Sequence, residues 1–230
     1  MKYIIIPARG GSKGIPNKNL KKIGGISLVS WSILHAQYIA IEGDKILVSS
    51  DSEKILNEAK KHGVSALKRP KYLSGDKVFT EPVMDQVLSK FKPNTKDIVV
   101  LLQPTSPLRT KLTLQKSINS VMYEGYDSSV TLKKIHQFKW KKVNDEYKPL
   151  YKDRPRRQDM DGEYCETGSV YVTTYKQYLK SGIRLSGKTY GVITDDAESI
   201  DIDSTVDLAL AQSLSQAFNK EWDIKKHNNL

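Results

Sequence analysis

The sequence IIIPARGGSKGIPNKN, residues 4–19, decides the fold of this chain. Its first residues form a short apolar run, which predicts a buried strand that ends at Pro7. The loop that follows contains three glycines, one hydroxyl and the cations Arg9, Lys13 and Lys18. Glycines allow backbone N–H groups to come close to a ligand, and Arg and Lys neutralise phosphate oxygens. The stretch therefore predicts a strand that opens into a binding loop for a triphosphate.

The same residues exclude two other phosphate-binding loops. A P-loop requires the pattern GxxxxGK[ST], whereas Lys13 here precedes Gly14. The dinucleotide fingerprint GxGxxG is also absent. The alternative left open by these residues is a glycine-rich surface turn that binds nothing.

Outward from this stretch, strand-like and helix-like segments alternate. This alternation predicts one α/β domain over residues 1–230, with a mostly parallel sheet flanked by helices. The expected strands are 2–6, 45–49, 64–67, 97–102, 128–132, 169–173 and 189–193. The expected helices are 27–41, 52–62, 80–91, 111–123, 174–181 and 204–218, the last of which starts at a capping box from Ser204 to Asp207. Ligand loops are then expected at the carboxyl ends of the strands.

One segment, about 135–166, breaks this alternation. It is rich in aromatic residues and mixed charges, and we interpret it as an insertion suited to an interface. The alternative is a loose surface loop. The polar end of the chain, Glu221–Leu230, is expected to fray.

A second motif, LLQPTSPLR at 101–109, follows the most apolar strand and is stiffened by two prolines. It is expected to place the polar groups of Gln103, Thr105, Ser106 and Arg109 at the mouth of the sheet. An amide, two hydroxyls and a guanidinium suit a polyhydroxylated ligand with a carboxylate. A proline-stiffened turn without a ligand is the alternative.

A third motif, SIDIDS at 199–204, carries two carboxylates. Residues two apart in an extended segment face the same side, so Asp201 and Asp203 are expected to point together. Two such carboxylates beside phosphates suit Mg²⁺. Alternatively, they stabilise the N-terminus of the following helix through its dipole, and the residues alone leave both possibilities open.

Composition limits the partners and the location. The formal net charge is +11 with a pI of about 9.5, which suits anionic small molecules such as nucleotides and acidic sugars. No RNA-binding aromatic motif or zinc finger accompanies the charge, so nucleic acid is not the expected partner. The single cysteine, Cys165, excludes an internal disulfide. No signal-peptide pattern and no long apolar window is present, so we expect a cytoplasmic protein without a membrane span.

Together, PARGGSKGIP with Lys18 and Asn19, LLQPTSPLR and the Asp-Ile-Asp at 201–203 resemble the signatures of the CMP-sialic acid synthetases (acylneuraminate cytidylyltransferases). The resemblance covers roughly the whole chain and implies that the mostly parallel sheet is a Rossmann-like nucleotidyltransferase sheet, with a small dimerisation insertion at about 135–166. The related CMP-Kdo synthetases have a Tyr-Gly-Ser-Thr-Arg-type first loop, so the chain is similar to the nonulosonate branch. At Thr167 it departs from the family, which commonly has Asn there, and this departure concerns the identity of the sugar.

The resemblance implies that CTP reacts with a nonulosonic acid, an acidic nine-carbon sugar, to give the CMP-sugar and pyrophosphate. It also implies Mg²⁺ on Asp201 and Asp203, and a homodimer whose insertion reaches over the partner's site. The implied nucleotide-binding residues are Arg9, Gly11, Ser12, Lys13, Lys18, Asn19, Arg69, Asp76 and Thr80. The implied sugar-binding residues are Gln103, Thr105, Ser106, Arg157, Gln158 and Thr167. Catalysis would depend on Lys18, Arg9, Asp201 and Asp203, and no general base is evident.

Two alternatives to this activity stay open. One is CTP-dependent activation of another 3-deoxy-2-ulosonic acid, of the legionaminic, pseudaminic or 8-amino-Kdo type. The other is a non-catalytic protein that binds nucleotides or nucleic acid through its positive charge.

Overall fold

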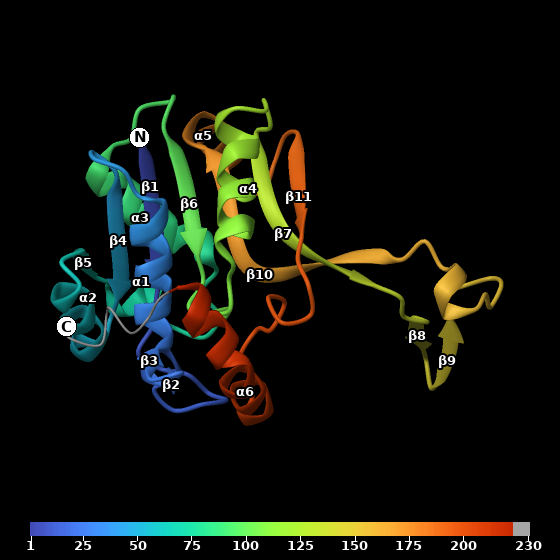
Figure 1. Ribbon diagram of the computed structural model, residues 1–230. Helices are drawn as coiled ribbons and strands as arrows, with labels where there is room; N and C mark the ends of the chain where they lie inside the picture. Colours follow the sequence, from blue (N-terminus) through green and yellow to red (C-terminus); the bar gives the residue numbers. More distant parts are fainter. Residues whose placement is uncertain (223–230) are drawn as a thin grey trace.

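Seven strands form the central sheet of the computed structural model, which describes residues 1–222 (Figure 1). Their order is β11-β7-β10-β6-β1-β4-β5. The strands are β1 (Lys2–Pro7), β4 (Lys45–Ser50), β5 (Ser65–Lys68), β6 (Ile98–Leu102), β7 (Ser128–Ile135), β10 (Glu163–Thr174) and β11 (Thr189–Ile193). Only β10 runs antiparallel to its neighbours, β6 and β7. The expected mostly parallel sheet is confirmed, whereas the predicted fraying lies, from residue 223 on, outside the described residues.

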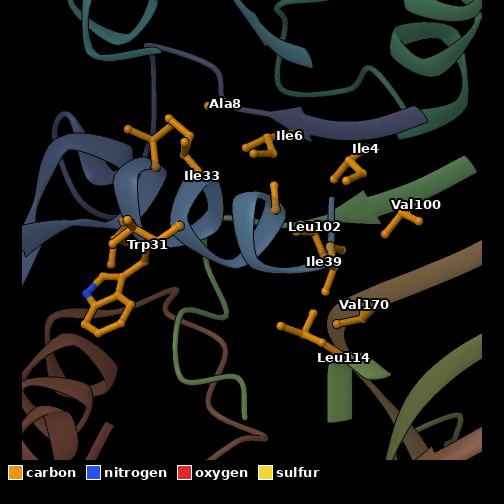
Figure 2. Close-up of a cluster of buried hydrophobic side chains, with 14 of the residues drawn as sticks. Ile4, Ile6, Ala8, Trp31, Ile33, Ile39, Val100, Leu102, Leu114 and Val170 are labelled. Carbon is orange, nitrogen blue, oxygen red and sulfur yellow. The ribbon is translucent and has the colours of Figure 1, made fainter. Parts of the chain in front are cut away.

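Side chains of β1 alternate between two hydrophobic cores, one on each face of the sheet. Ile4 and Ile6 belong to one core, and Tyr3 and Ile5 belong to the other. The first core, part of which Figure 2 shows, is covered by α1 (Leu28–Ile39), α2 (Glu53–Lys61), α4 (Lys111–Met122) and α6 (Thr205–Glu221). The second is covered by α3 (Thr80–Phe91) and α5 (Tyr175–Ser181). Because helices cover both faces of the sheet, a ligand is expected to reach it at the strand ends.

Hydroxyl side chains determine where several helices begin. The hydroxyl oxygens of Ser27, Thr110 and Thr174 each accept a hydrogen bond from the backbone N–H three residues later. Ser204 and Asp207 form the predicted capping box at the start of α6. A cap of this kind stabilises a helix by about 1 kcal/mol.

A hairpin extends away from the body of the molecule at the far ends of β7 and β10 (Figure 1). We call residues 136–162 the arm; it contains β8 (Trp140–Val143), β9 (Glu146–Pro149) and the short 3-10 helix η3 (Arg157–Asp159). Phe138 and Tyr151 pack edge to face with ring centroids 5.0 Å apart, and the guanidinium of Arg154 lies 4.7 Å from the Phe138 ring centroid. These contacts make the segment a folded hairpin rather than a loose loop.

Smaller elements were not expected from the sequence. They are the 3-10 helices η1 (Lys18–Leu20) and η2 (Lys71–Leu73) and the short pair of strands β2 (Lys22–Ile23) and β3 (Ile26–Ser27). Within residues 1–222, no helix combines the length and the apolar character needed to cross a bilayer.

Candidate functional site

A cleft of about 230 Å³ opens at the carboxyl ends of β1 and β6, where the ligand loops were expected. The loop after β1, the segment that leads into α3 and the turn after β6 form its walls. Of the residues predicted for the site, the cleft is lined by Arg9, Gly11, Ser12, Lys18, Asn19, Arg69, Asp76, Thr80, Gln103 and Thr105. Residues more than 80 positions apart in the chain thus share one cavity.

The three glycines of the first loop have different roles. A Cβ atom on Gly10 would lie 2.7 Å from Cβ of Ser52, and one on Gly14 would lie 2.6 Å from the carbonyl oxygen of Asp203. Gly11 has no atom within 4 Å of such a Cβ, and it lines the cleft. Gly10 and Gly14 therefore allow close packing of the loop, and only Gly11 leaves room for a ligand. The loop is also held by Asp51, which accepts a 2.8 Å hydrogen bond from the Gly10 N–H.

Lys18 connects this loop to the Asp-Ile-Asp segment. Its Nζ donates hydrogen bonds to the carbonyl of Ile202 (2.7 Å) and to Oδ1 of Asp203 (2.9 Å). Asn19 donates to the carbonyl of Arg9 at 2.9 Å, while its buried Oδ1 has no partner among the described residues. Lys18 thus brings a cation to the cleft beside the predicted metal ligands, and Asn19 brings a free acceptor.

Arg9 and Lys13 both form ion pairs with Asp76. The Arg9–Asp76 contact is a short hydrogen bond, and Nζ of Lys13 lies 3.0 Å from Oδ2 of Asp76. Hydrogen bonds from Arg9 and Lys13 hold the pKa of the Asp76 carboxyl below its usual range. The carboxylate of Asp76 therefore neutralises two of the cations assigned to the phosphates, and it would compete with the phosphates for them, in contrast to its expected role in binding the nucleotide.

Arg69 is buried, and it contributes to the lining of the cleft. It donates to the hydroxyl of Ser49 (3.2 Å) and to its carbonyl (2.7 Å). Burial lowers the pKa of Arg69 to about 10, against the opposing charge of Asp51. It stays a cation at neutral pH and contributes positive charge to the floor of the cleft.

Asp201 and Asp203 flank Ile202, which is fully buried, and both carboxylates are exposed. This is the predicted alternation. Desolvation by the surrounding protein raises the pKa of Asp201 despite its solvent access, and the charge of Asp203 raises it further. A hydrogen bond from Thr105 and the charge of Lys18 oppose this shift. The two carboxylates are thus close enough to repel each other.

Ser204 and Asp207 cap α6, so Asp201 and Asp203 are not the residues that cap this helix. Asp207 also accepts the backbone N–H groups of Asp203 and Ser204, at 3.1 and 2.7 Å. Asp201 and Asp203 together supply hard oxygen donors whose mutual repulsion a cation would relieve, so the donor set fits Mg²⁺. Within residues 1–222 no three His, Cys, Asp or Glu side chains form a metal cluster. A Mg²⁺ ion here would depend on these two carboxylates, water and substrate phosphates.

The turn after β6 divides into an exposed and a buried part. Gln103 and Thr105 line the cleft. Ser106 is fully buried and donates to the carbonyl of Thr167 at 3.3 Å. The expected position of Arg109 at the mouth of the sheet is wrong: its side chain is fully buried, and burial lowers its pKa to about 9.

Thr167 does not reach the cleft either. It is 5% exposed, and its hydroxyl donates to Oγ1 of Thr131 at 2.7 Å. The expectation that Thr167 contacts a sugar is contradicted by this placement. Gly168, which is partly exposed, lies nearer to the site than Thr167. It has a φ of +70° and lies within the bulge of β10, and a Cβ atom added to it would lie 3.3 Å from Oδ2 of Asp201.

Arg157 and Gln158 lie on the arm, in η3, and neither lines the cleft of the same chain. Arg157 instead borders a hollow at the base of the arm with Lys133, Lys134 and His136. One chain therefore does not bring the two arm residues to the other predicted sugar ligands.

The apolar wall of the cleft was missed by sequence reasoning. It consists of Pro7, Leu73, Val78, Phe79, Val83 and Pro104. Phe79 is 78% exposed, which is unusual for a phenylalanine at the start of a helix. Phe79 and Val83 are four residues apart, which places them on the same side of a helix beside Thr80. This spacing is the sequence pattern from which the apolar wall could have been predicted.

Comparison with known proteins gives one family. The family model described as "Cytidylyltransferase" matches residues 3–210. The chain is similar to N-acylneuraminate cytidylyltransferase of Oncorhynchus mykiss, with 32% identity over 215 residues, 90% of this chain and 49% of that protein. It is also similar to N-acylneuraminate cytidylyltransferase A of Danio rerio (32% identity, 90% of this chain, 49% of that protein) and to the enzyme of Streptococcus agalactiae serotype V (30%, 88% and 50%). The chain thus spans about half the length of the curated relatives it matches.

A solved structure resembles the fold over almost its whole length. It is a CMP:2-keto-3-deoxy-manno-octonic acid synthetase complexed with CTP, with a TM-score of 0.65 and 17% identity. The match covers 94% of this chain and 98% of that chain. At this identity the likeness concerns the arrangement of the sheet and helices.

Proposed function

Because the chain belongs to the cytidylyltransferase family, we propose that it transfers a cytidylyl group from CTP to an acidic nine-carbon sugar, an N-acylneuraminate or a close analogue. The products are the CMP-sugar and pyrophosphate. The observation that carries the proposal is a cleft lined by both the cationic loop after β1 and Gln103, with Lys18 of that loop hydrogen-bonded to the Asp-Ile-Asp segment.

Charge and shape support the nucleotide half of this proposal. Arg9, Ser12 and Lys18 provide cations and a hydroxyl for the phosphates, and Gly11 leaves the space that a phosphate needs. The apolar wall around Val78 and Phe79 suits the flat face of a base, because aromatic and aliphatic side chains stack on such rings. The free Oδ1 of Asn19 accepts one further hydrogen bond.

The reaction is an in-line displacement at the α-phosphorus of CTP. The anomeric hydroxyl of the sugar forms the new O–P bond, the bond from the α-phosphorus to the bridging oxygen breaks, and the hydroxyl proton passes to solvent. Two anions must meet, so the contribution of the protein is positioning and neutralisation of charge. Lys18 holds an ammonium group where charge develops on the α-phosphate, and Gln103 orients the sugar.

Asp201 and Asp203 would hold Mg²⁺ beside the phosphates. When bound, the ion neutralises phosphate oxygens and makes the sugar hydroxyl more acidic. The 2.9 Å ion pair with Lys18 holds the Asp203 carboxylate in place.

We further propose that the protein is a cytoplasmic homodimer in which the arm of one subunit completes the sugar site of the other. The arm carries exposed aromatic residues, including Trp140 and Tyr147, which suit an interface. Arg157 and Gln158, which do not reach the cleft of their own chain, would then supply the remaining contacts to the sugar. A C₂ dimer makes this contribution reciprocal.

A panel of acids tests the activity. The chain is incubated with CTP, Mg²⁺ and either N-acetylneuraminate, a legionaminic, pseudaminic or 8-amino-Kdo-type acid, or Kdo, and pyrophosphate release is measured. We expect the highest kcat/KM with N-acetylneuraminate, and a preference for another acid would reassign the sugar. Pyrophosphate release with none of them would refute the proposed function and favour a non-catalytic nucleotide- or nucleic-acid-binding protein.

A further inference from the structure

Arg109 has an environment that is unusual for an arginine. Its side chain is fully buried, and among the described residues no carboxylate forms a direct salt bridge with it, although the charges of Asp201 and Glu198 oppose the lowering of its pKa by burial. Burying a cation without an ionic partner costs several kcal/mol, unless hydrogen bonds replace its hydration. The role of Arg109 must therefore be sought in the acceptors that surround it.

Two of these acceptors are carbonyl groups at the edge of the cleft. Nη2 of Arg109 donates a short hydrogen bond to the carbonyl of Gln103 and a 2.9 Å hydrogen bond to the carbonyl of Ser169. The N–H of Gln103 donates to the same carbonyl of Ser169, at 3.3 Å. The guanidinium thus joins the turn after β6 to the bulge of β10.

Both joined segments carry groups of the candidate site. Gln103 lines the cleft. Ser169 follows Gly168, and a Cβ atom added to Gly168 would lie 3.3 Å from Oδ2 of Asp201 and 3.9 Å from Oε1 of Gln103. The N–H of Ile202 donates to the carbonyl of Thr105 at 2.8 Å, which attaches the Asp-Ile-Asp segment to the same turn.

The opposite side of the guanidinium is fixed by α1. Nη1 donates to the hydroxyl of Ser32 (3.2 Å) and to Nδ1 of His35 (3.2 Å). His35 is fully buried, its ring centroid is 4.5 Å from that of Trp222, and burial together with the charge of Arg109 lowers its pKa well below the usual value. His35 is therefore a neutral acceptor, and the planar guanidinium has a single orientation.

We propose that Arg109 is a positioning residue for the sugar: by holding the carbonyls of Gln103 and Ser169 together, it sets the distance between the Gln103 side chain and Asp201. The inference rests on the proposed function, because it concerns the sugar half of that site. Within residues 1–222, the hydrogen bonds of the guanidinium go to Ser32, His35, Gln103 and Ser169, and none goes to the nucleotide half around Arg9, Ser12 and Lys18. A change at Arg109 should therefore affect the two substrates unequally.

Two substitutions separate positioning from general stability. Arg109→Lys keeps a charge but loses the planar fork that joins two carbonyls. Arg109→Gln removes the buried charge and keeps a planar donor, so it serves if the lysine variant does not fold. Ser32→Ala is the matched control, because it removes an acceptor on the α1 side and leaves both carbonyl contacts in place.

The measurement is steady-state KM for the sugar and for CTP, well below the melting temperature of each variant. The sugar is N-acetylneuraminate, or whichever acid of the panel the wild type uses. We expect both Arg109 variants to raise KM for the sugar about tenfold or more, with KM for CTP within about twofold, and Ser32→Ala to leave both values nearly unchanged.

Failure of the inference is distinguishable from failure of the function. If the wild type is active and the folded Arg109 variants change both KM values alike, or change only the melting temperature, Arg109 is merely structural and the inference is wrong. If the wild type releases no pyrophosphate with any acid, the proposed function fails, and the inference fails with it.

Discussion

Asp201 combines two demands that oppose each other. Its carboxylate must be ionised to bind a cation, yet the protein around it and the charge of Asp203 raise its pKa. For a carboxyl group whose pKa is raised by folding, the native state loses stability as pH rises through that pKa. The residue is therefore expected to lower stability at neutral pH in exchange for function.

Asp201→Asn tests this conflict. We expect turnover to fall about 100-fold or more, because a metal ligand is lost. The melting temperature at pH 7 should rise, since Asn cannot ionise, and the difference from wild type should disappear below about pH 4, where Asp is protonated in both states. Melting curves from pH 3 to 8 measure this, with Glu42→Gln, an exposed carboxylate in the turn before β4, as the control. A destabilised variant at pH 7 would contradict the assignment.

Asp76 provides a second prediction, since it neutralises Arg9 and Lys13 in the absence of nucleotide. If CTP has to displace these ion pairs, Asp76→Asn will bind CTP more tightly, by about threefold, the scale expected for exposed ion pairs. Titration calorimetry at low salt measures the Kd. The control is Glu53→Gln, which breaks the exposed ion pair between Glu53 of α2 and Lys68 of β5.

The opposite result for Asp76 is equally informative. Weaker binding in Asp76→Asn would mean that the carboxylate contacts the nucleotide directly, as the sequence motif predicted. The ion pairs with Arg9 and Lys13 would then serve to orient Asp76 rather than to compete with the phosphates.

Site residues within local motifs were predictable, and residues defined by distant contacts were not. Asp201 and Asp203 follow from the two-residue period of an extended segment, and Lys18 lies in a recognisable loop. The burial of Arg109 depends on acceptors at positions 32, 35 and 169, and that of Thr167 depends on Thr131. No pattern within either motif reports such partners, so Arg109 was placed wrongly at the mouth of the sheet and Thr167 was expected among the sugar contacts.

At the scale of elements, the loop after β1 is held by close backbone packing rather than by flexible glycines. Gly14→Ala would place a Cβ 2.6 Å from the carbonyl oxygen of Asp203, which is backbone and cannot turn away. We expect a loss of about 1–3 kcal/mol in the free energy of unfolding, and displacement of the Asp-Ile-Asp segment. Urea denaturation measures this loss.

Gly11→Ala is the matched substitution in the same loop. Its Cβ would meet no atom within 4 Å, so stability should stay within about 0.5 kcal/mol of wild type. The methyl group would project into the cleft, and KM for CTP should rise several-fold. If both alanine variants were as stable as wild type, the packing interpretation of Gly14 would be wrong.

Most strands and helices were predicted within a few residues, because apolar periodicity and caps are local signals. The exceptions concern pairing. The periodicity of residues 169–173 indicated a strand, but not that β10 begins at Glu163 and runs antiparallel between β6 and β7. Likewise, the strands of the arm carry few buried side chains, so the two-residue alternation that marks a strand is missing there.

At the scale of the whole molecule, the arm and the cleft occupy different parts of one chain. Subunit complementation tests whether they meet across a dimer. Arg157→Ala and Asp203→Ala should each be nearly inactive alone. When the two variants are mixed in equal amounts and exchange subunits, half of the dimers contain one subunit of each. Each of these mixed dimers has one intact site out of two, so about one quarter of wild-type activity should return.

The control for this experiment mixes two variants of the same half-site, Asp201→Asn and Asp203→Ala, from which no activity should return. Recovery of activity in the control mixture would place the arm outside the partner's site. The same conclusion would follow if the Arg157 mixture recovered no activity although size-exclusion chromatography with light scattering showed dimers. A monomeric protein with full activity would refute the dimer itself.

The position of β1 in the sheet has a consequence for how the chain is made. β1 lies between β4 and β6, and its partner β6 is about 100 residues further along the chain. While a ribosome is still translating that interval, the apolar strand Lys2–Pro7 has one open edge, which is a risk for aggregation. The contact of Lys18 with Ile202 spans 184 residues, so the candidate site is among the last parts to assemble during synthesis. Truncated products that end before Asp201 would thus contain the strands of the sheet without the Asp-Ile-Asp segment.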